Sequence, residues 1–181
     1  MKKRTASIFR LLPRISVLIA IILLSGRMNT YGQESSTIND VQGYINTVKE
    51  KAKEAAIYAE KAYNAISFND LKINAKQAAS LLDEAKKAVN DANKALASVT
   101  IPSDQLKYKT TIGNILSQIE DLQNKVNWAQ LKSSDAADIN ELEEAKHLSN
   151  KTLNELKRVD KVAIEIQEEL TKAEQILTRI D

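Results

Sequence analysis

The sequence predicts an all-α protein, an antiparallel four-helix bundle with coiled-coil-like, alanine-rich seams. Beyond residue 33, apolar residues recur at alternating intervals of three and four, which is the spacing of a helix packed lengthwise against other helices. Glycine and proline are scarce there, so few positions can end a helix. The one proline beyond the leader, Pro102, divides the remaining chain into two halves of two helices each.

The first helix is expected over residues 37–67, with Ser36 or Asn39 as its N-cap. Half of its seam is alanine, which lets a neighbouring backbone approach closely. The seam residues are Ile38, Val41, Ile45, Val48, Ala52, Ala55, Ala59, Ala62 and Ile66.

The second helix is expected over residues 70–99. Five residues separate Ile66 from Leu71, which breaks the phase of the seam and predicts a tight turn at Ser67–Asp70. Asn69 or Asp70 would then cap the second helix. Its seam residues are Leu71, Ala75, Ala78, Leu82, Ala85, Val89, Ala92, Leu96 and Val99.

The third helix is expected over residues 103–131, because Pro102 cannot continue a helix and Ser103 is a good N-cap. Gly113 lies inside it and weakens it by about 1 kcal/mol relative to alanine. The run Ser133-Ser134-Asp135 is expected to end it and to start the next. Its seam residues are Tyr108, Ile112, Ile115, Ile119, Leu122, Val126 and Ala129.

The fourth helix is expected over residues 134–180 and is unusually long. Unbroken, it would measure ~70 Å, against ~45 Å for each of the others. Its seam is poor between Glu143 and Thr152. Either it breaks near residues 149–150, or about a third of it projects beyond the bundle. Its seam residues are Ile139, Leu142, Leu153, Leu156, Val159 or Asp160, Ala163, Ile166, Leu170, Ala173, Leu177 and Ile180.

A projecting fourth helix would leave an apolar stripe uncovered, and such stripes usually bind a partner. We therefore expect a protein partner, or a second copy of the chain, to dock there. The candidate partner-binding residues are Ile166, Leu170, Ala173, Leu177 and Ile180.

Residues 1–33 have the pattern of a secretory signal peptide. Six basic residues and no acid accompany the apolar run 15–24, and Thr30 and Gly32 supply small side chains for cleavage after residue 32 or 33. The apolar run is about half of the ~20 residues that span a bilayer, so an uncleaved anchor is the lesser alternative. Residues 34–181 would form a single exported domain without a membrane span, periplasmic or secreted from a bacterial cell envelope.

Composition excludes several classes of function. Without the six basic residues of the leader, 20 basic residues face 24 acidic ones, a net charge of −4, which does not suit nucleic acid. The absence of cysteine excludes disulfides, thiolate metal sites and a lipid-bearing cysteine. Full disorder is disfavoured because large aliphatic residues occur on every seam.

One motif suggests metal chemistry. Glu144 and His147 are three residues apart, as are the inward-facing ligands of di-iron helical bundles. That design needs two such motifs, and His147 is the only histidine, so a second half-site could come only from a second copy. We expect an exposed histidine on a polar face, and neither a metal nor another cofactor.

No enzymatic motif accompanies it. A Gly-x-Ser-x-Gly elbow and a glycine-rich phosphate loop are both lacking. Adjacent carboxylates lie off the seams among lysines, where weak ion pairs on a solvated face explain them. The aromatic residues are expected at the edge of the core, or alternatively in a small recognition patch for a partner or glycan. They are Tyr44, Tyr58, Tyr63, Phe68 and Trp128.

These observations favour an exported, non-enzymatic bundle that acts as a structural or protein-interaction module. The alternative is a bundle of the cell envelope that binds a small ligand, a lipid or a metal between its helices. The alanine-rich seams argue against a hollow interior, because small side chains favour close packing of the backbones.

Overall fold

The computed structural model describes residues 12–99, 101 and 105–179, with side chains from residue 34 onward. These residues form four helices and no strand, which confirms the all-α four-helix bundle. The helices are α1 (Leu12–Tyr63), α2 (Phe68–Ala97), α3 (Leu106–Asp138) and α4 (Leu142–Leu177). The predicted cap Ser103, like residues 1–11 of the predicted leader, lies outside the described residues.

Contacts divide the chain into one unit that ends at Ser36 and a second that starts at Thr37, and α1 contributes to both. In the described part of the first unit the backbone is helical. No helix among the described residues is long and apolar enough to cross a membrane. The second unit contains the bundle, and the following paragraphs concern that unit alone.

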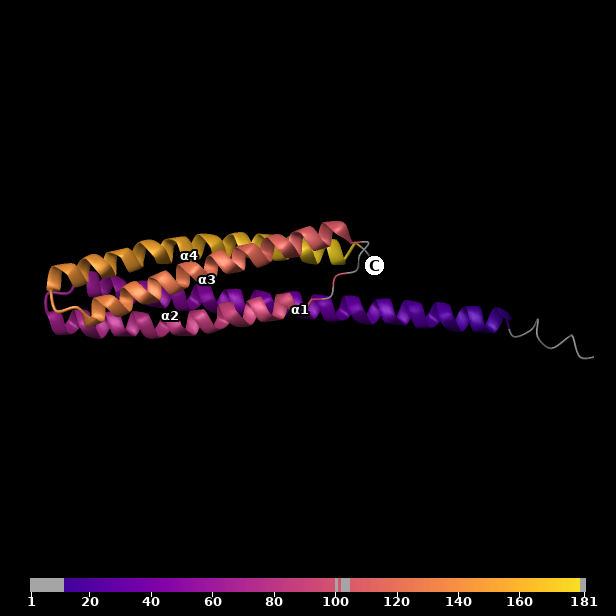
Figure 1. Cartoon of the computed structure of the whole chain (residues 1–181), viewed down its shortest axis with the longest axis horizontal. Coiled ribbons are helices and arrows are strands. Elements are labelled where there is room, and N and C mark those ends of the chain that lie inside the picture. Colours follow the sequence, from indigo (N-terminus) through magenta and orange to yellow (C-terminus); the bar gives the residue numbers. More distant parts are fainter. Residues whose placement is uncertain (1–11, 100, 102–104, 180–181) are drawn as a thin grey trace, which may run out of the picture. The chain divides into compact units, whose positions relative to one another are not determined.

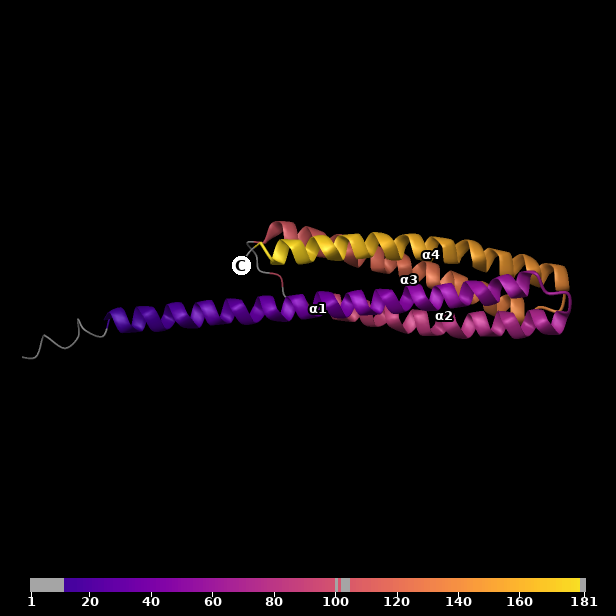
Figure 2. The same cartoon turned by 180° about the vertical axis from the view of Figure 1, so that it is seen from behind.

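In the bundle, successive helices run in opposite directions (Figures 1 and 2). α3 packs along both α2 and α4. Side-chain bonds join α1 to both of its neighbours as well. These bonds are Lys51 to Glu84 (3.0 Å, α1–α2) and Lys49 Nζ to Gln167 Oε1 (2.9 Å, α1–α4). Between α3 and α2, Gln123 Nε2 donates a hydrogen bond to Asn90 Oδ1 (2.7 Å). The hydrogen bond to Glu84 raises the pKa of Lys51 above its usual value.

Most residues of the predicted seams form the core, whereas Val99, Ile139, Leu142 and Leu153 are only partly buried. Every seam residue from Ile38 to Ala62, from Leu71 to Leu96 and from Tyr108 to Ala129 is buried. Ile66 is the clear error, because it is 94% exposed. α1 ends at Tyr63, so the three-and-four spacing no longer applies at residue 66, and Ala65 is buried instead.

The first turn lies earlier than predicted, at residues 64–67. Ser67 is the N-cap of α2: its Oγ accepts a hydrogen bond from the amide of Asp70 at 3.1 Å and donates one to Asp70 Oδ2 at 2.7 Å. The predicted caps, Asn69 and Asp70, are therefore wrong. Asp70 is the third helical residue, and its carboxylate accepts a hydrogen bond from the capping hydroxyl.

The boundary between the third and fourth helices was also misplaced. α3 continues to Asp138, because Ser133 keeps the register of the seam and its buried hydroxyl donates a hydrogen bond to the carbonyl of Ala75 on α2 at 2.9 Å. The turn lies at residues 139–141. Ile139, expected in the fourth helix, packs at this end of the bundle against an apolar cluster. The cluster consists of Ala62, Ala65, Leu71, Ala75, Ala136, Ala137, Ala145 and Leu148, with Phe68, Ile139 and Leu142 partly buried against it.

α4 neither breaks near residues 149–150 nor projects, so both alternatives were wrong. It starts at Leu142 rather than Ser134, and its 36 residues span about 54 Å, close to about 50 Å for the 33 residues of α3. Ser149 and Thr152 complete its seam. Both are buried, and each hydroxyl donates to the carbonyl four residues earlier, at 3.0 and 3.2 Å.

Candidate binding surfaces

The row expected to bind a partner is part of the core. Ile166 and Ala173 are fully buried, Leu170 and Leu177 are 1% and 5% exposed, and Ile180 lies outside the described residues. Gln167, which directly follows Ile166, receives a hydrogen bond from Lys49 and donates one to Asn46 Oδ1 at 2.6 Å, so α1 packs beside this part of α4. The premise of an uncovered stripe is wrong, because the described residues of this row are buried within the bundle.

Glu144 and His147 are both exposed, which confirms the expectation for the histidine. His147 lines a shallow polar hollow of about 460 Å³ between the ends of α1 and α4, together with Tyr63, Glu143 and Asn150 among others. Among the side chains that the structure describes, no three histidine, aspartate or glutamate residues converge on a point where they could hold a metal ion.

A groove of about 430 Å³ runs between α1 and α4, and we refer to it as the α1–α4 groove. It is lined by Ala52, Lys53, Ala56, Ile57, Glu60, Asn150, Leu153, Leu156, Lys157 and Asp160. Ile57 is 53% exposed although it is a large apolar residue. Ala52 and Ala56 on α1 have small side chains, and the longer side chains of α4 do not fill the space beside them.

The polar groups of the α1–α4 groove differ in their exposure. Lys53, Glu60 and Lys157 are exposed, and none of them forms an ion pair with a described residue. Asp160 is only partly exposed, and its Oδ1 is buried without a hydrogen-bond partner among the described residues. The groove therefore combines an apolar lining with one unsatisfied buried acceptor.

A second groove, of about 300 Å³, lies between α3 and α4, and we refer to it as the α3–α4 groove. It is lined by Trp128, Lys132, Lys151, Asn154, Glu155 and Arg158. The residue Trp128 is 56% exposed, so it lies further from the core than predicted, and Lys132 Nζ lies 5.6 Å from the centre of its ring. Leu131, three residues further along α3, is 45% exposed.

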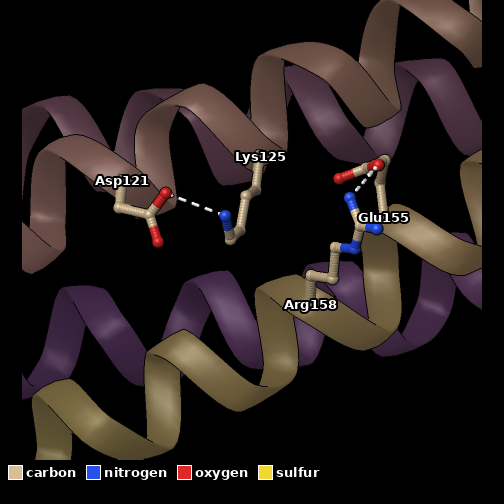
Figure 3. A network of polar contacts seen from close by, with 4 residues as sticks. All are labelled: Asp121, Lys125, Glu155 and Arg158. Carbon is tan, nitrogen blue, oxygen red and sulfur yellow. Dashed lines mark hydrogen bonds and ion pairs between the residues drawn. The ribbon is translucent and has the colours of Figure 1, made fainter.

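Two of the lining cations form ion pairs, Arg158 with Glu155 and Lys132 with Asp135 at 3.2 Å, and a further pair lies nearby on α3. Arg158 binds Glu155 at 2.9 Å on α4, and Lys125 binds Asp121 at 2.8 Å on α3. Figure 3 shows both pairs extending into the space between the two helices. Lys151 makes no ion pair with any described residue, so it adds an uncompensated positive charge to the α3–α4 groove.

The predicted seams include four residues that line the α1–α4 groove, Ala52, Leu153, Leu156 and Asp160, but seam spacing does not show which residues face an unfilled space. Ala56 and Ile57 directly follow the seam residue Ala55, and Asp160 directly follows Val159. A groove is indicated where small residues on one helix face larger ones on its neighbour. To find such a place, one must know which helices are neighbours and in what register they pack.

Comparison with known proteins adds no name to these surfaces: no family model, no curated protein and no solved structure matches the chain.

Proposed function

We propose that this chain is an exported, non-enzymatic helical-bundle protein of the bacterial cell envelope that acts as a structural or protein-interaction module. Its docking surface is the α3–α4 groove together with Leu131. The observation that carries this proposal is the exposed side chain of Trp128, which lines the groove together with three cationic residues. The proposal of export rests on the pattern of residues 1–33.

Trp128 supports protein docking by its chemistry and its position. Tryptophan and arginine are enriched among the residues that contribute most to protein–protein binding, and Leu131 extends the apolar area beside Trp128. The cation of Lys132 above the ring is an added attraction that a partner would help to desolvate. An exposed indole of this kind is poorly explained as packing within the bundle.

The charges indicate which partner the groove would accept. Its lining holds Lys132, Lys151 and Arg158 with one carboxylate, Glu155. Lys132 also pairs with Asp135 at 3.2 Å, so the positive excess of the groove is the charge of Lys151, whereas residues 34–181 as a whole carry a net charge of −4. A positive groove attracts an acidic surface and repels the same groove on a second copy, which disfavours a dimer that joins two such grooves. We therefore propose an acidic protein segment as the occupant rather than a second copy.

The experiment replaces Leu131 with a photo-crosslinking amino acid in the full chain, expressed in its native cell. The control carries the same group at Ile73 on α2, which is 58% exposed and lines neither groove. We expect an adduct with a discrete acidic protein from position 131 and none from position 73. The adduct should disappear when Lys132→Glu and Arg158→Glu are added.

Circular dichroism of the doubly substituted chain should show unchanged helix content, so that loss of the adduct reports lost docking. Absence of an adduct at position 131, equal adducts at both positions, or an adduct that survives charge reversal would each refute the proposal. An adduct between two copies of the chain would replace it with self-association.

A further inference from the structure

We infer that the end of the bundle at which its two turns meet is a second docking surface, for a basic protein segment that carries a large apolar residue. We call it the bundle-end surface, and it comprises residues 63–72 and 138–147. It does not depend on the α3–α4 groove and has the opposite charge, so a bundle that uses both would hold two different partners.

The turn between α1 and α2 and the turn between α3 and α4 lie at the same end of the bundle (Figures 1 and 2). Lys72 Nζ on α2 donates a hydrogen bond to Asn140 Oδ1 in the second turn at 3.3 Å. Ala65 of the first turn belongs to the same apolar cluster as Ala145 of α4. The two turns therefore form one surface that a single partner could contact.

Large apolar side chains reach solvent at this end. Ile66 is 94% exposed, more than any other large apolar residue that the structure describes, and Tyr63 is 43% exposed. Phe68, Ile139 and Leu142 pack against the apolar cluster of this end and stay partly exposed. A partner that covers Ile66 removes apolar surface from water, and that burial is the favourable contribution expected of its own apolar residue.

The charge of the bundle-end surface selects a basic partner. Five carboxylates and two lysines lie in it, a net charge of −3, whereas residues 34–181 as a whole carry −4. Such a surface attracts a basic segment and repels both an anionic membrane and the same end of a second copy. The carboxylates are Asp70, Asp138, Glu141, Glu143 and Glu144, and the lysines are Lys72 and Lys146.

Three of these carboxylates are available to a partner. Asp138, Glu141 and Glu144 are exposed, and none of them forms an ion pair with a described residue, whereas Glu143 pairs with Lys146 at 3.4 Å. Asp138 lies in the last turn of α3, where the helix dipole disfavours a negative charge, and that turn has no basic residue to offset it. A lysine or arginine of the partner supplies the missing positive charge.

The polar hollow around His147 adds hydrogen-bonding groups to this surface. The side chains of Asn64, His147 and Asn150 line it, and none of them forms a hydrogen bond with a described residue. Tyr63 lines it as well. Tyrosine and asparagine are frequent in protein-binding surfaces, because the ring offers rigid contact area and the amide adapts its hydrogen bonds to the partner.

The test measures the binding of three synthetic peptides to the full chain by isothermal titration calorimetry. The first is a short amphipathic peptide of leucine and lysine. In the second, glutamate replaces every lysine, and in the third, serine replaces every leucine. We expect the leucine–lysine peptide to bind about tenfold more tightly than either of the others, because it alone supplies both positive charge and apolar surface.

A substitution of the apolar residue locates the binding. Ile66→Ser should weaken the leucine–lysine peptide about tenfold, because the peptide then covers no large apolar side chain at the turn. Leu106→Ser is the matched control, at a residue that is 73% exposed and starts α3 at the opposite end of the bundle. It should leave the affinity unchanged.

A second pair of variants tests the charges. Glu141→Gln with Glu144→Gln should weaken the leucine–lysine peptide about fivefold at physiological ionic strength. The control, Asp83→Asn with Glu120→Gln, removes the same charge from exposed positions of α2 and α3 that form no ion pair with a described residue. It should change the affinity less than about twofold, because these positions lie several turns away and the Debye length is about 8 Å.

The inference is overturned if the leucine–lysine peptide does not bind, or if the leucine–glutamate peptide binds as tightly. It is also overturned if Ile66→Ser has no effect in a chain whose helix content is unchanged by circular dichroism. Equal effects of the two pairs of charge variants would reduce the attraction to the net charge of the chain and remove the site.

The same Ile66→Ser variant separates the other possible occupants. Vesicles of phosphatidylglycerol should not bind the parent chain, and vesicle binding that Ile66→Ser abolishes would assign the surface to a membrane instead. Analytical ultracentrifugation should give the same mass for the parent and the variant. A dimer that Ile66→Ser dissociates would replace the basic segment with a second copy.

Discussion

A serine or threonine in this bundle either caps a helix or lies inside one, depending on the hydrogen bond of its hydroxyl group. Ser67 caps α2, whereas Ser133, Ser149 and Thr152 are buried inside helices that continue past them. The hydroxyl of Ser67 accepts a hydrogen bond from a free amide at the start of α2. The three buried hydroxyls instead donate to carbonyls, Ser133 to one on α2 and the other two to their own helix. A buried hydroxyl with a partner carries little penalty, so a serine that looks like a helix end can serve as part of a seam.

At this scale, Ser67→Ala should lower the free energy of unfolding by about 0.5–2 kcal/mol, because the amide of Asp70 loses its capping acceptor. Urea denaturation followed by circular dichroism measures the change. Ser80→Ala, at an exposed position within α2, is the matched control and should stay within about 0.5 kcal/mol of the parent. Equal effects of the two substitutions would contradict the assignment of the cap.

At the scale of the element, α4 shows how a seam with polar members can still be continuous. From Ala145 to Leu177 its buried row keeps the three-and-four spacing, and Ser149 and Thr152 occupy the positions that lack large apolar residues. The absence of apolar residues there was interpreted as a weak point in the helix. Small residues were sufficient because this part of α4 packs near the alanine-rich end of the bundle.

The same helix offers a test that separates a core row from a docking surface. Ile166→Ala should lower the free energy of unfolding by about 2–5 kcal/mol, because it opens a cavity at a fully buried site. Ile164→Ala removes the same atoms from a side chain that is 41% exposed, and should change stability by about 0.5 kcal/mol or less. Chemical denaturation of both variants makes the comparison, and a small effect of Ile166→Ala would restore the row as a candidate docking surface.

At the scale of the whole molecule, four helices of similar span share the core of the bundle in residues 37–179. The prediction that residues 1–33 are a leader rests on their sequence pattern. Contacts separate the two units between Ser36 and Thr37, a few residues beyond the predicted cleavage site. Export and cleavage stay predictions that rest on residues 1–33.

They are tested by the mass and N-terminal sequence of the chain recovered from its native cell. We expect the recovered chain to start at residue 33 or 34, following cleavage after Gly32 or Gln33. Substituting Gly32→Leu, which places a large side chain at the −1 position, should slow this cleavage, whereas Gln33→Glu should not prevent it. A chain that keeps the leader in the parent protein would favour the uncleaved anchor instead.

The sequence by itself determined the fold class and nearly all of the core, because burial on a packed helix follows a period that can be read directly from residue spacing. It also determined that His147 would be exposed, since no apolar pattern surrounds it. The cap at Ser67 and the continuation of α3 past Ser133 depend on individual hydrogen bonds, one local and one to α2, which spacing does not reveal. The two grooves were decided by the tertiary structure alone, because a hollow depends on which side chains face each other across two helices.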